Sequence, residues 1–367
     1  MVTLVSPEGA YGGPVRVAVN QAKELLRLGH EVVIYGTFSG YSERPTSIEG
    51  VPAKLFKARN VFPRAGFAGT MSATLWKALA ADLQNFDVVH VHMARDLVTL
   101  PAALVAKLLG TPYVLQTHGM VDPSGKFLSR PLDSVLTRPL LRHAFRVFFL
   151  TPVEQHQLAE VARRPLRLQE LHNGVPKASV ESSQADTPEV LYLARLHPRK
   201  QPTLFAKVAA ALLASGQDAR FTLVGPDEGE GAKVAEVIAK ASSKRLQWEG
   251  ALAPEMTLPR MKKAAVYVLP SFDEPFPMSV LEAMSVGVPV IITRTCGLAD
   301  VIREGKAGVI IDSNFQSLEK AIVSLLEDEI MRNEMGENAR RLAEESFSMD
   351  VIARRLEDIY EQSVRAC

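Results

Sequence analysis

Short runs of apolar residues alternate with helical patterns along the whole chain, which is the rhythm of βα units that build a parallel sheet. In the first half, strands are predicted at 2–6, 31–35, 87–92, 113–117 and 146–150. In the second half, strands are predicted at 190–194, 220–224, 246–249, 266–269, 290–293 and 309–311. Apolar spacings of three and four residues predict helices over 14–28, ending near Gly29, and over 349–364.

A polar stretch without periodicity, at 177–188, separates the two alternating patterns and has the composition of a connection. The chain has 367 residues, and because a domain has roughly 150, two domains fit better than one or three. We therefore expect an α/β protein with two Rossmann-like, doubly wound parallel-sheet domains facing across a cleft. Ligands of such sheets bind at the carboxyl ends of the strands.

Composition and charge narrow the function classes. Hydrophobic residues make up 47% and charged residues 23%, as in ordinary globular proteins. Only Cys296 and Cys367 are available, which excludes a disulfide framework and a cysteine-rich metal site. The chain has no apolar run of 18 residues, and its start lacks the basic and apolar regions of a signal peptide. A cytoplasmic protein is expected.

Charge is distributed unevenly between the two halves. Residues 1–180 hold 20 Lys and Arg against 13 Asp and Glu, and residues 181–367 hold 22 against 28. A basic first half favours an anionic partner such as a lipid surface, whereas nucleic-acid-binding domains are usually more basic than this. We expect no nucleic-acid partner and a peripheral contact with the inner membrane face.

Two loops that follow predicted strands have the residues of an anion site. Gly12 and Gly13 lie between the first strand and a helix, where the backbone can approach a phosphate beside free amides. A tight βα connection is the alternative, and the pattern is not G-x-G-x-x-G. Arg195 and Lys200 follow the strand at 190–194 and can neutralise a diphosphate. The alternative for these cations is a solvated loop.

The segment 269–284 combines a strand end, a proline-rich turn and a helix predicted to begin near Pro277. Glu274 lies in the turn and Glu282 about two helical turns further, so both can face one ligand. Carboxylates accept hydrogen bonds from hydroxyl groups, and the amides at the helix start donate to them: those of Phe276, Met278 and Ser279. The alternatives are a helix-capping carboxylate for Glu274 and a surface acid for Glu282.

Histidines and a basic segment complete the candidates. His90 and His92 share one face of a strand, and His118 follows another strand. A zinc site is one reading, although no carboxylate or cysteine stands at motif spacing. For His90 a buried structural role is favoured, and for His118 a ligand contact and a structural hydrogen bond are both open. The basic amphipathic segment 126–146 suggests a membrane surface or, more simply, a packed helix with a solvated face.

With these residues the chain resembles the retaining glycosyltransferases of family 4, which have the GT-B fold. The resemblance covers nearly the whole length and rests on the following motifs: Gly12-Gly13, Gly29-His30-Glu31-Val32, His118-Gly119, Asn173-Gly174-Val175-Pro176, Arg195 with Lys200, and Glu274 with Glu282. Here Glu-Pro-Phe-Pro-Met-Ser replaces the Glu-Pro-Phe-Gly of many members, and Pro277 has no N–H to donate.

The resemblance implies a role for each matching residue. Arg195 and Lys200 would hold the donor diphosphate, Glu282 the ribose, and Glu274 would lie beside the transferring sugar. Gly12 and Gly13 would approach the phosphates, and His118 the sugar near its reacting carbon. Residues 276–279 would hold the sugar hydroxyls. No cofactor and no metal are expected, since the sequence has no Asp-x-Asp pair and Arg and Lys take the metal's place in this fold.

The resemblance also implies domain limits and a reaction. We expect a first domain at 1–172, a linker at 173–187, a second domain at 188–349 and a final helix at 350–367 that packs back on the first domain. The expected activity is transfer of a hexose-type sugar from a nucleoside-diphosphate sugar to a saccharide or lipid-linked acceptor in glycan synthesis. The alternatives are a nucleotide-sugar epimerase or hydrolase of the same fold and a non-catalytic two-domain sugar-binding protein.

Overall fold

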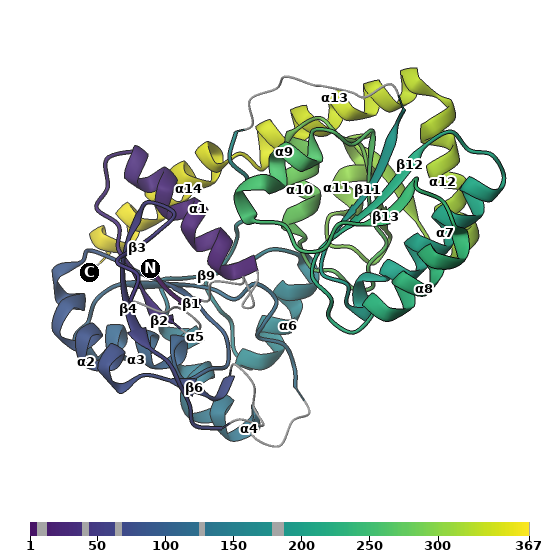
Figure 1. Cartoon of the computed structure of the whole chain (residues 1–367). Coiled ribbons are helices and arrows are strands. Elements are labelled where there is room, and N and C mark those ends of the chain that lie inside the picture. The colour runs from purple at the N-terminus through teal and green to yellow at the C-terminus, as the bar shows by residue number, and fades with distance from the viewer. Residues whose placement is uncertain (6–12, 39–43, 63–67, 125–128, 178–186, 367) are drawn as a thin grey trace. The chain divides into compact units, whose positions relative to one another are not determined.

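A computed structural model describes residues 1–5, 13–38, 44–62, 68–124, 129–177 and 187–366. The chain divides into two compact units, each with its own sheet (Figure 1). Unit 1 comprises Met1–Gly174 with Met349–Cys367, and unit 2 comprises Val175–Ser348. The chain therefore changes unit at 174–175 and at 348–349, whereas the expected limits were 172 and 349–350. Most of the expected linker, 178–186, lies outside the described residues.

Unit 1 has an eight-stranded sheet in the order β10-β9-β8-β7-β1-β2-β4-β3, parallel except for the β3–β4 pair. Its strands are β1 (Val2–Val5), β2 (Ile34–Phe38), β3 (Ser47–Ile48), β4 (Val51–Lys57), β7 (Val89–His92), β8 (Tyr113–Gln116), β9 (Arg146–Phe149) and β10 (Leu168–Glu170). A separate antiparallel pair is formed by β5 (Arg59–Asn60) and β6 (Thr70–Met71). The residues of β7 and β8 are all buried, as expected of central parallel strands covered on both faces.

The helices of unit 1 follow the predicted alternation. They are α1 (Gly13–Arg27), α2 (Ala73–Asp82), α3 (Thr99–Leu109), α4 (Ser129–Leu132), α5 (Arg138–His143), α6 (Pro152–Ala162) and α14 (Met349–Arg365), with short turns at Leu83–Asn85 and Asp133–Thr137. Gly29 ends the first helix region as predicted, because its positive φ of 96° lets its amide and that of His30 bond back to Leu26 and Leu25.

Unit 1 departs from the predicted strands in several places, and the short strands β3, β5, β6 and β10 were not predicted. The second strand begins at Ile34, three residues later than expected. Strand β4 was not predicted, although Val51, Ala53 and Leu55 are buried while Pro52 and Lys54 are exposed. This alternation with a period of two is the pattern of a strand with one solvated face, so the signal was present in the sequence.

Helix α14 packs on unit 1, which confirms the expected return of the last helix. Its buried face meets strands β8 and β9 through a cluster of Val114, Phe148, Leu171, Met349, Ile352, Leu356 and Ile359. Arg27 of α1 pairs with Asp350, and His30 with Glu357, so α14 lies beside α1 (Figure 1). A Cβ on Gly174 would come within 2.4 Å of Met349 Sδ and 3.2 Å of Met349 Cα, so a larger residue would force the two segments to shift.

Unit 2 has a fully parallel six-stranded sheet in the order β13-β12-β11-β14-β15-β16. Its strands are β11 (Glu189–Leu193), β12 (Arg220–Val224), β13 (Leu246–Trp248), β14 (Val266–Leu269), β15 (Val290–Thr293) and β16 (Gly308–Ile311). Its helices are α7 (Pro202–Ala214), α8 (Gly231–Ala241), α9 (Thr257–Met261), α10 (Met278–Ser285), α11 (Ala299–Glu304), α12 (Phe315–Glu327) and α13 (Glu329–Ser346), with short turns at Pro198–Lys200 and Pro254–Met256. Each observed strand end lies within one residue of its predicted position.

No helix among the described residues is both long enough and apolar enough to span a membrane.

Candidate active site

The strand order of unit 2 places two predicted loops side by side. Strands β11 and β14 are parallel neighbours, and the order of strands reverses between them. The loop after β11 carries Arg195 and Lys200, and the loop after β14 carries Glu274. A reversal of this kind leaves a crevice at the carboxyl ends of the strands, where open α/β sheets bind ligands.

Lys200 and Glu274 form a buried ion pair at this edge. The Lys200 ammonium donates to Glu274 Oε2, and the side chains are only 13% and 10% exposed. Arg199 Nη2 lies 3.5 Å from the same oxygen. Burial lowers the pKa of Lys200, an effect that Glu274 opposes. The two loops are also joined through their backbones, since the Phe272 amide donates to the Arg199 carbonyl at 2.9 Å.

The turn that carries Glu274 is fixed by the loop after β15. The Glu274 carbonyl accepts from the Gly297 amide at 2.8 Å, and the Asp273 amide donates to Thr295 Oγ1 at 3.1 Å. Asp273 has a positive φ of 44°, a conformation that costs free energy in a non-glycine residue. Several tertiary contacts therefore hold the carboxylate, and the capping role considered for Glu274 is not observed because Pro277 occupies the N-cap of α10.

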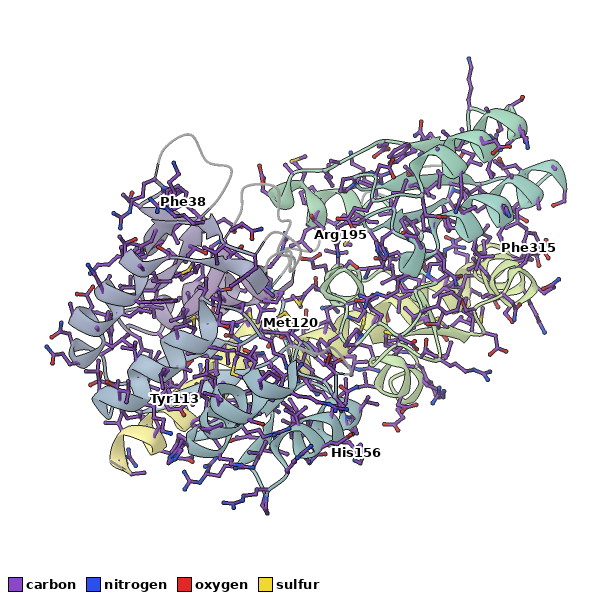
Figure 2. The ribbon with its side chains drawn as sticks, turned by 90° about the horizontal axis from the view of Figure 1, so that it is seen from below. Phe38, Tyr113, Met120, His156, Arg195 and Phe315 are labelled. Carbon is purple, nitrogen blue, oxygen red and sulfur yellow. The ribbon has the colours of Figure 1, made fainter. Side chains whose placement is uncertain are left out.

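Arg195 is held differently from Lys200. Its Nη1 lies 2.7 and 2.9 Å from the two carboxylate oxygens of Glu228, in the loop after β12, and its side chain is 44% exposed. Arg195 is labelled in Figure 2. An exposed ion pair contributes little free energy, so Arg195 can exchange Glu228 for another anion. Burial has the largest effect on the pKa of Lys200, and the positive charges of Arg199 and Arg195 lower it further. The three cations therefore act on one another.

Helix α10 brings Glu282 towards the same region. Glu282 is buried, so it is not the surface acid of the alternative reading. Burial is the main cause that raises the pKa of Tyr267, and Glu282 and Glu274 add to it. The Tyr267 hydroxyl contacts Ser279 Oγ at 2.8 Å and the Leu193 carbonyl at 2.9 Å, which ties the start of α10 to the end of β11.

The start of α10 corrects one detail of the prediction. Pro277 is the N-cap, with an extended backbone, rather than a residue of the first helical turn. Met278 and Ser279 are the first helical residues, and amides at such positions have no partner within the helix. Phe276 is buried, and its ring packs on Phe347 at 5.9 Å, so its side chain has a structural role.

In unit 1, the glycine loop falls partly outside the described residues. Gly12 is not described, whereas Gly13 is the first residue of α1 and is exposed. A Cβ on Gly13 would meet no atom within 4 Å among the described residues. The structure therefore gives no packing reason for glycine at this position.

His118 lies in a turn that follows the carboxyl end of β8. Its φ is 51° and that of Gly119 is 72°. The Glu154 carboxylate fixes this turn: one oxygen accepts from Thr117 Oγ1 and the Gly119 amide, both at 2.6 Å. The other oxygen accepts from the Leu150 amide at 2.7 Å.

Glu154 was missed by the sequence analysis. Its only signal was the pair Thr151 and Glu154, which has the spacing of a capping box at the start of α6. Thr151 does cap the helix, since its hydroxyl accepts from the Glu154 amide. The Glu154 carboxylate instead reaches across to the loop after β8, a contact that the local pattern does not reveal.

His90, His92 and His118 form a stacked column. The ring centroids are 4.6 Å apart for His90 and His92 and 5.1 Å apart for His92 and His118. His92 Nδ1 lies 2.9 Å from His118 Nε2, and His90 Nδ1 lies 2.6 Å from the Tyr360 hydroxyl. Burial lowers the pKa of all three imidazoles, to about 3 for His118. The structural role favoured for His90 is confirmed.

In the described ranges, no group of three His, Cys, Asp or Glu side chains could hold a metal ion. The geometry thus gives no support to the zinc reading of the three histidines.

The basic segment 126–146 is described from residue 129 onward. Arg138 donates to the Val161 carbonyl and Arg142 to the Ala162 carbonyl, at the end of α6. These arginines therefore satisfy helix-end carbonyls, in agreement with the packed-helix alternative.

Comparison with known proteins assigns the chain to a family. The family described as "Glycosyl transferases group 1" matches residues 177–342, and that described as "Glycosyl transferase 4-like domain" matches residues 12–174. The chain belongs to the group 1 glycosyltransferases. Its fold is GT-B, as expected, with α/β units built on mostly parallel sheets.

Relatives of this group 1 glycosyltransferase differ in what they are named for. A D-inositol 3-phosphate glycosyltransferase of Nocardioides is 26% identical, covering 97% of this chain and 86% of the relative. UDP-Gal:alpha-D-GlcNAc-diphosphoundecaprenol alpha-1,3-galactosyltransferase of Escherichia coli is 25% identical, covering 78% of each chain. Anabaena Alr3699/HepE in complex with UDP has a TM-score of 0.73 at 16% identity, covering 98% of this chain and 99% of that one.

Proposed function

We propose that this group 1 glycosyltransferase transfers a hexose-type sugar from a nucleoside-diphosphate sugar to a saccharide or lipid-linked acceptor, with retention of configuration. The observation that carries the proposal is the contact of Lys200 and Arg199 with Glu274 at the strand reversal of unit 2, with Arg195 in the same loop and acting on the pKa of Lys200. Preorganised cations suit a reaction in which negative charge develops on a departing diphosphate.

Each residue of unit 2 has a proposed part in this reaction. Arg195 and Lys200 hold the diphosphate and stabilise the leaving nucleotide. Glu282 accepts hydrogen bonds from the ribose hydroxyls, and Glu274 lies beside the transferring sugar. The loop and helix-start amides of Phe276, Met278 and Ser279 donate to sugar hydroxyls, while Pro277 shapes the turn without donating.

Unit 1 supplies the remaining contacts in this proposal. Gly12 and Gly13 approach the phosphates, and His118 contacts the sugar near the reacting carbon. The acceptor attacks from the face that the nucleoside diphosphate leaves, which retains the configuration of the sugar. Fixed arginine and lysine charges stabilise the leaving group, so the reaction proceeds without a metal or other cofactor.

The comparisons suggest which substrates to test first. The Anabaena structure holds UDP, and the E. coli relative is named for a UDP-sugar and a diphosphoundecaprenol acceptor. UDP is therefore the first base to test, and polyprenyl diphosphate saccharides the first acceptors. Such an acceptor would place the protein in the cytoplasm at the inner membrane face, in synthesis of an envelope or extracellular glycan.

Two alternatives use the same donor site. An epimerase or hydrolase would release product from the nucleotide sugar without any acceptor. A non-catalytic sugar-binding protein would bind the nucleotide sugar and release nothing. The chain has all four candidate donor-site residues, Arg195, Lys200, Glu274 and Glu282, which favours catalysis.

The test combines binding with turnover. UDP, GDP, ADP, CMP and NAD are compared by thermal unfolding, since a ligand of the folded state stabilises it by about 2.7 kcal/mol at 100 times its Kd. Sugar conjugates of the best base are then assayed for nucleotide release, with EDTA and with or without acceptor. We expect one nucleoside diphosphate to raise Tm and its conjugate to turn over in EDTA. No shift with any nucleotide would refute the donor site.

A further inference from the structure

We propose that His92 is a positioning residue that holds His118 as the Nδ1–H tautomer, so that His118 presents a neutral N–H donor to an oxygen of the donor sugar. The role towards the sugar rests on the proposed function. The tautomer itself rests only on the geometry of unit 1.

The contact between His92 and His118 requires one donor and one acceptor. His92 Nδ1 and His118 Nε2 are 2.9 Å apart, and the ring planes are nearly parallel, with an angle of 8° between them. Burial holds the pKa of both rings below the usual range, so both are neutral near pH 7. In a neutral imidazole one nitrogen carries the proton and the other accepts, so two tautomeric arrangements are conceivable.

The surroundings of His92 distinguish these arrangements. Its Nε2 is buried and has no hydrogen-bond partner in the described part of the chain. If His92 Nδ1 accepted from His118, the His92 proton would be on Nε2, as a buried N–H without an acceptor. Buried N–H groups of that kind are rare in folded proteins, more so than unpaired acceptors. His92 therefore carries its proton on Nδ1 and donates it to His118 Nε2.

The neighbouring ring, His90, has partners of its own. His90 Nδ1 lies 2.6 Å from the Tyr360 hydroxyl, and a hydrogen bond with Gln116 raises the pKa of His90 against the larger lowering by burial. Neither hydrogen-bond partner is His118, so His90 serves as a control for the contact between His92 and His118.

The consequence for His118 is a defined donor. Because Nε2 accepts, its proton is on Nδ1, which makes no hydrogen bond within the described residues. The residue is partly exposed, and its backbone is fixed in the left-handed region by the contacts of Glu154 with the adjoining residues. A neutral N–H can donate to a sugar oxygen while leaving the charge at the diphosphate to the cations of unit 2.

The direct test reads the tautomer by NMR. Long-range ¹H–¹⁵N correlation spectra of histidine-labelled protein at pH 7, assigned with His118→Asn, report which nitrogen of His118 is protonated. We expect the Nδ1–H signature in the native protein. His92→Asn keeps an amide donor near the position of Nδ1 and should preserve the signature, whereas His92→Phe should shift the population towards Nε2–H. His90→Asn, in the same stack, is the matched control and should change nothing at His118.

Activity then tests the role towards the sugar. In His92→Phe we expect kcat for nucleotide-sugar turnover to fall about tenfold or more, as when other orienting partners are removed, with rescue in His92→Asn. An Nε2–H signature in the native protein, or the same His118 tautomer in His92→Phe, would overturn the proposal. If the tautomers are as expected but no nucleotide sugar turns over, the proposed function fails while the assignment of His92 stands.

Discussion

Individual side chains at the candidate donor site differ in how firmly they are held. Lys200 is buried against Glu274, whereas Arg195 is partly exposed against Glu228. Removing one partner of a buried ion pair leaves an uncompensated charge, whereas breaking an exposed pair costs little. Lys200 is therefore part of the structure of the site as well as a candidate phosphate ligand, and Arg195 is the cleaner residue to mutate.

Arg195→Ala should lower the rate of nucleotide release about 10²-fold or more, because a preorganised positive charge at the leaving group is lost. The free energy of unfolding should change little, since the pair with Glu228 is exposed. Initial rates with the best nucleotide sugar, together with urea unfolding, check both expectations. Glu228→Gln removes the carboxylate that pairs with Arg195 but keeps the positive charge of Arg195. This variant should keep most of the rate of nucleotide release. Native turnover in Arg195→Ala would rule out the assigned role.

At the level of elements, α14 stabilises unit 1 from the far end of the sequence. Its apolar residues recur every three or four positions and cover β8 and β9, and Gly174 leaves room for Met349. Most of the stability of such a helix comes from packing of its apolar face rather than from its own propensity. Strand β8, which leads into the turn of His118, is therefore supported by a helix more than 200 residues away in the sequence.

Leu356→Ala should destabilise unit 1 by about 2–5 kcal/mol, because Leu356 is fully buried against the sheet and its truncation leaves a cavity. Urea unfolding followed by Trp76 fluorescence, with Trp248→Phe as background, reports on unit 1. Arg354→Ala, on the exposed face of the same helix, is the control and should change stability by less than about 0.5 kcal/mol. Equal effects of the two substitutions would show that the docked face contributes nothing.

For the molecule as a whole, His90, His92 and His118 make stability depend on pH. Their pKa values are lowered on folding, from an unfolded value of about 6.5. As the pH falls below 6.5 the unfolded chain therefore binds protons that the folded chain does not, and stability is lost at about 1.4 kcal/mol per pH unit for each histidine. Asp96 opposes this between about pH 4 and 6, because burial raises its pKa to about 6 and the folded state then binds the extra proton.

His118→Asn should therefore make the loss of stability between pH 6 and 4 shallower by about 1.4 kcal/mol per pH unit. Urea unfolding of unit 1 at several pH values measures the slope. His156→Asn removes an exposed histidine of α6 and should leave the slope unchanged (Figure 2). The same slope in native protein and His118→Asn would mean that His118 titrates alike in the folded and unfolded states.

The sequence by itself determined the order of the βα segments, the division into two α/β units and the loops that carry the candidate site residues. It could do so because hydrophobic periodicity reports burial locally, and because the carboxyl ends of parallel strands gather at one edge. Arg195, Lys200 and Glu274 could be selected on that basis. Strand β4 was also readable from Val51 to Leu55 and was overlooked.

Only the tertiary structure decided which of these residues meet. Lys200 bonds to Glu274, 74 positions away, because β11 and β14 are neighbours in the sheet. Glu154 reaches the Gly119 amide because its helix starts beside the end of β8, and His92 meets His118 because β7 and β8 pair in register. Strand order is set by the packing of the whole chain, and no local pattern of residues encodes it.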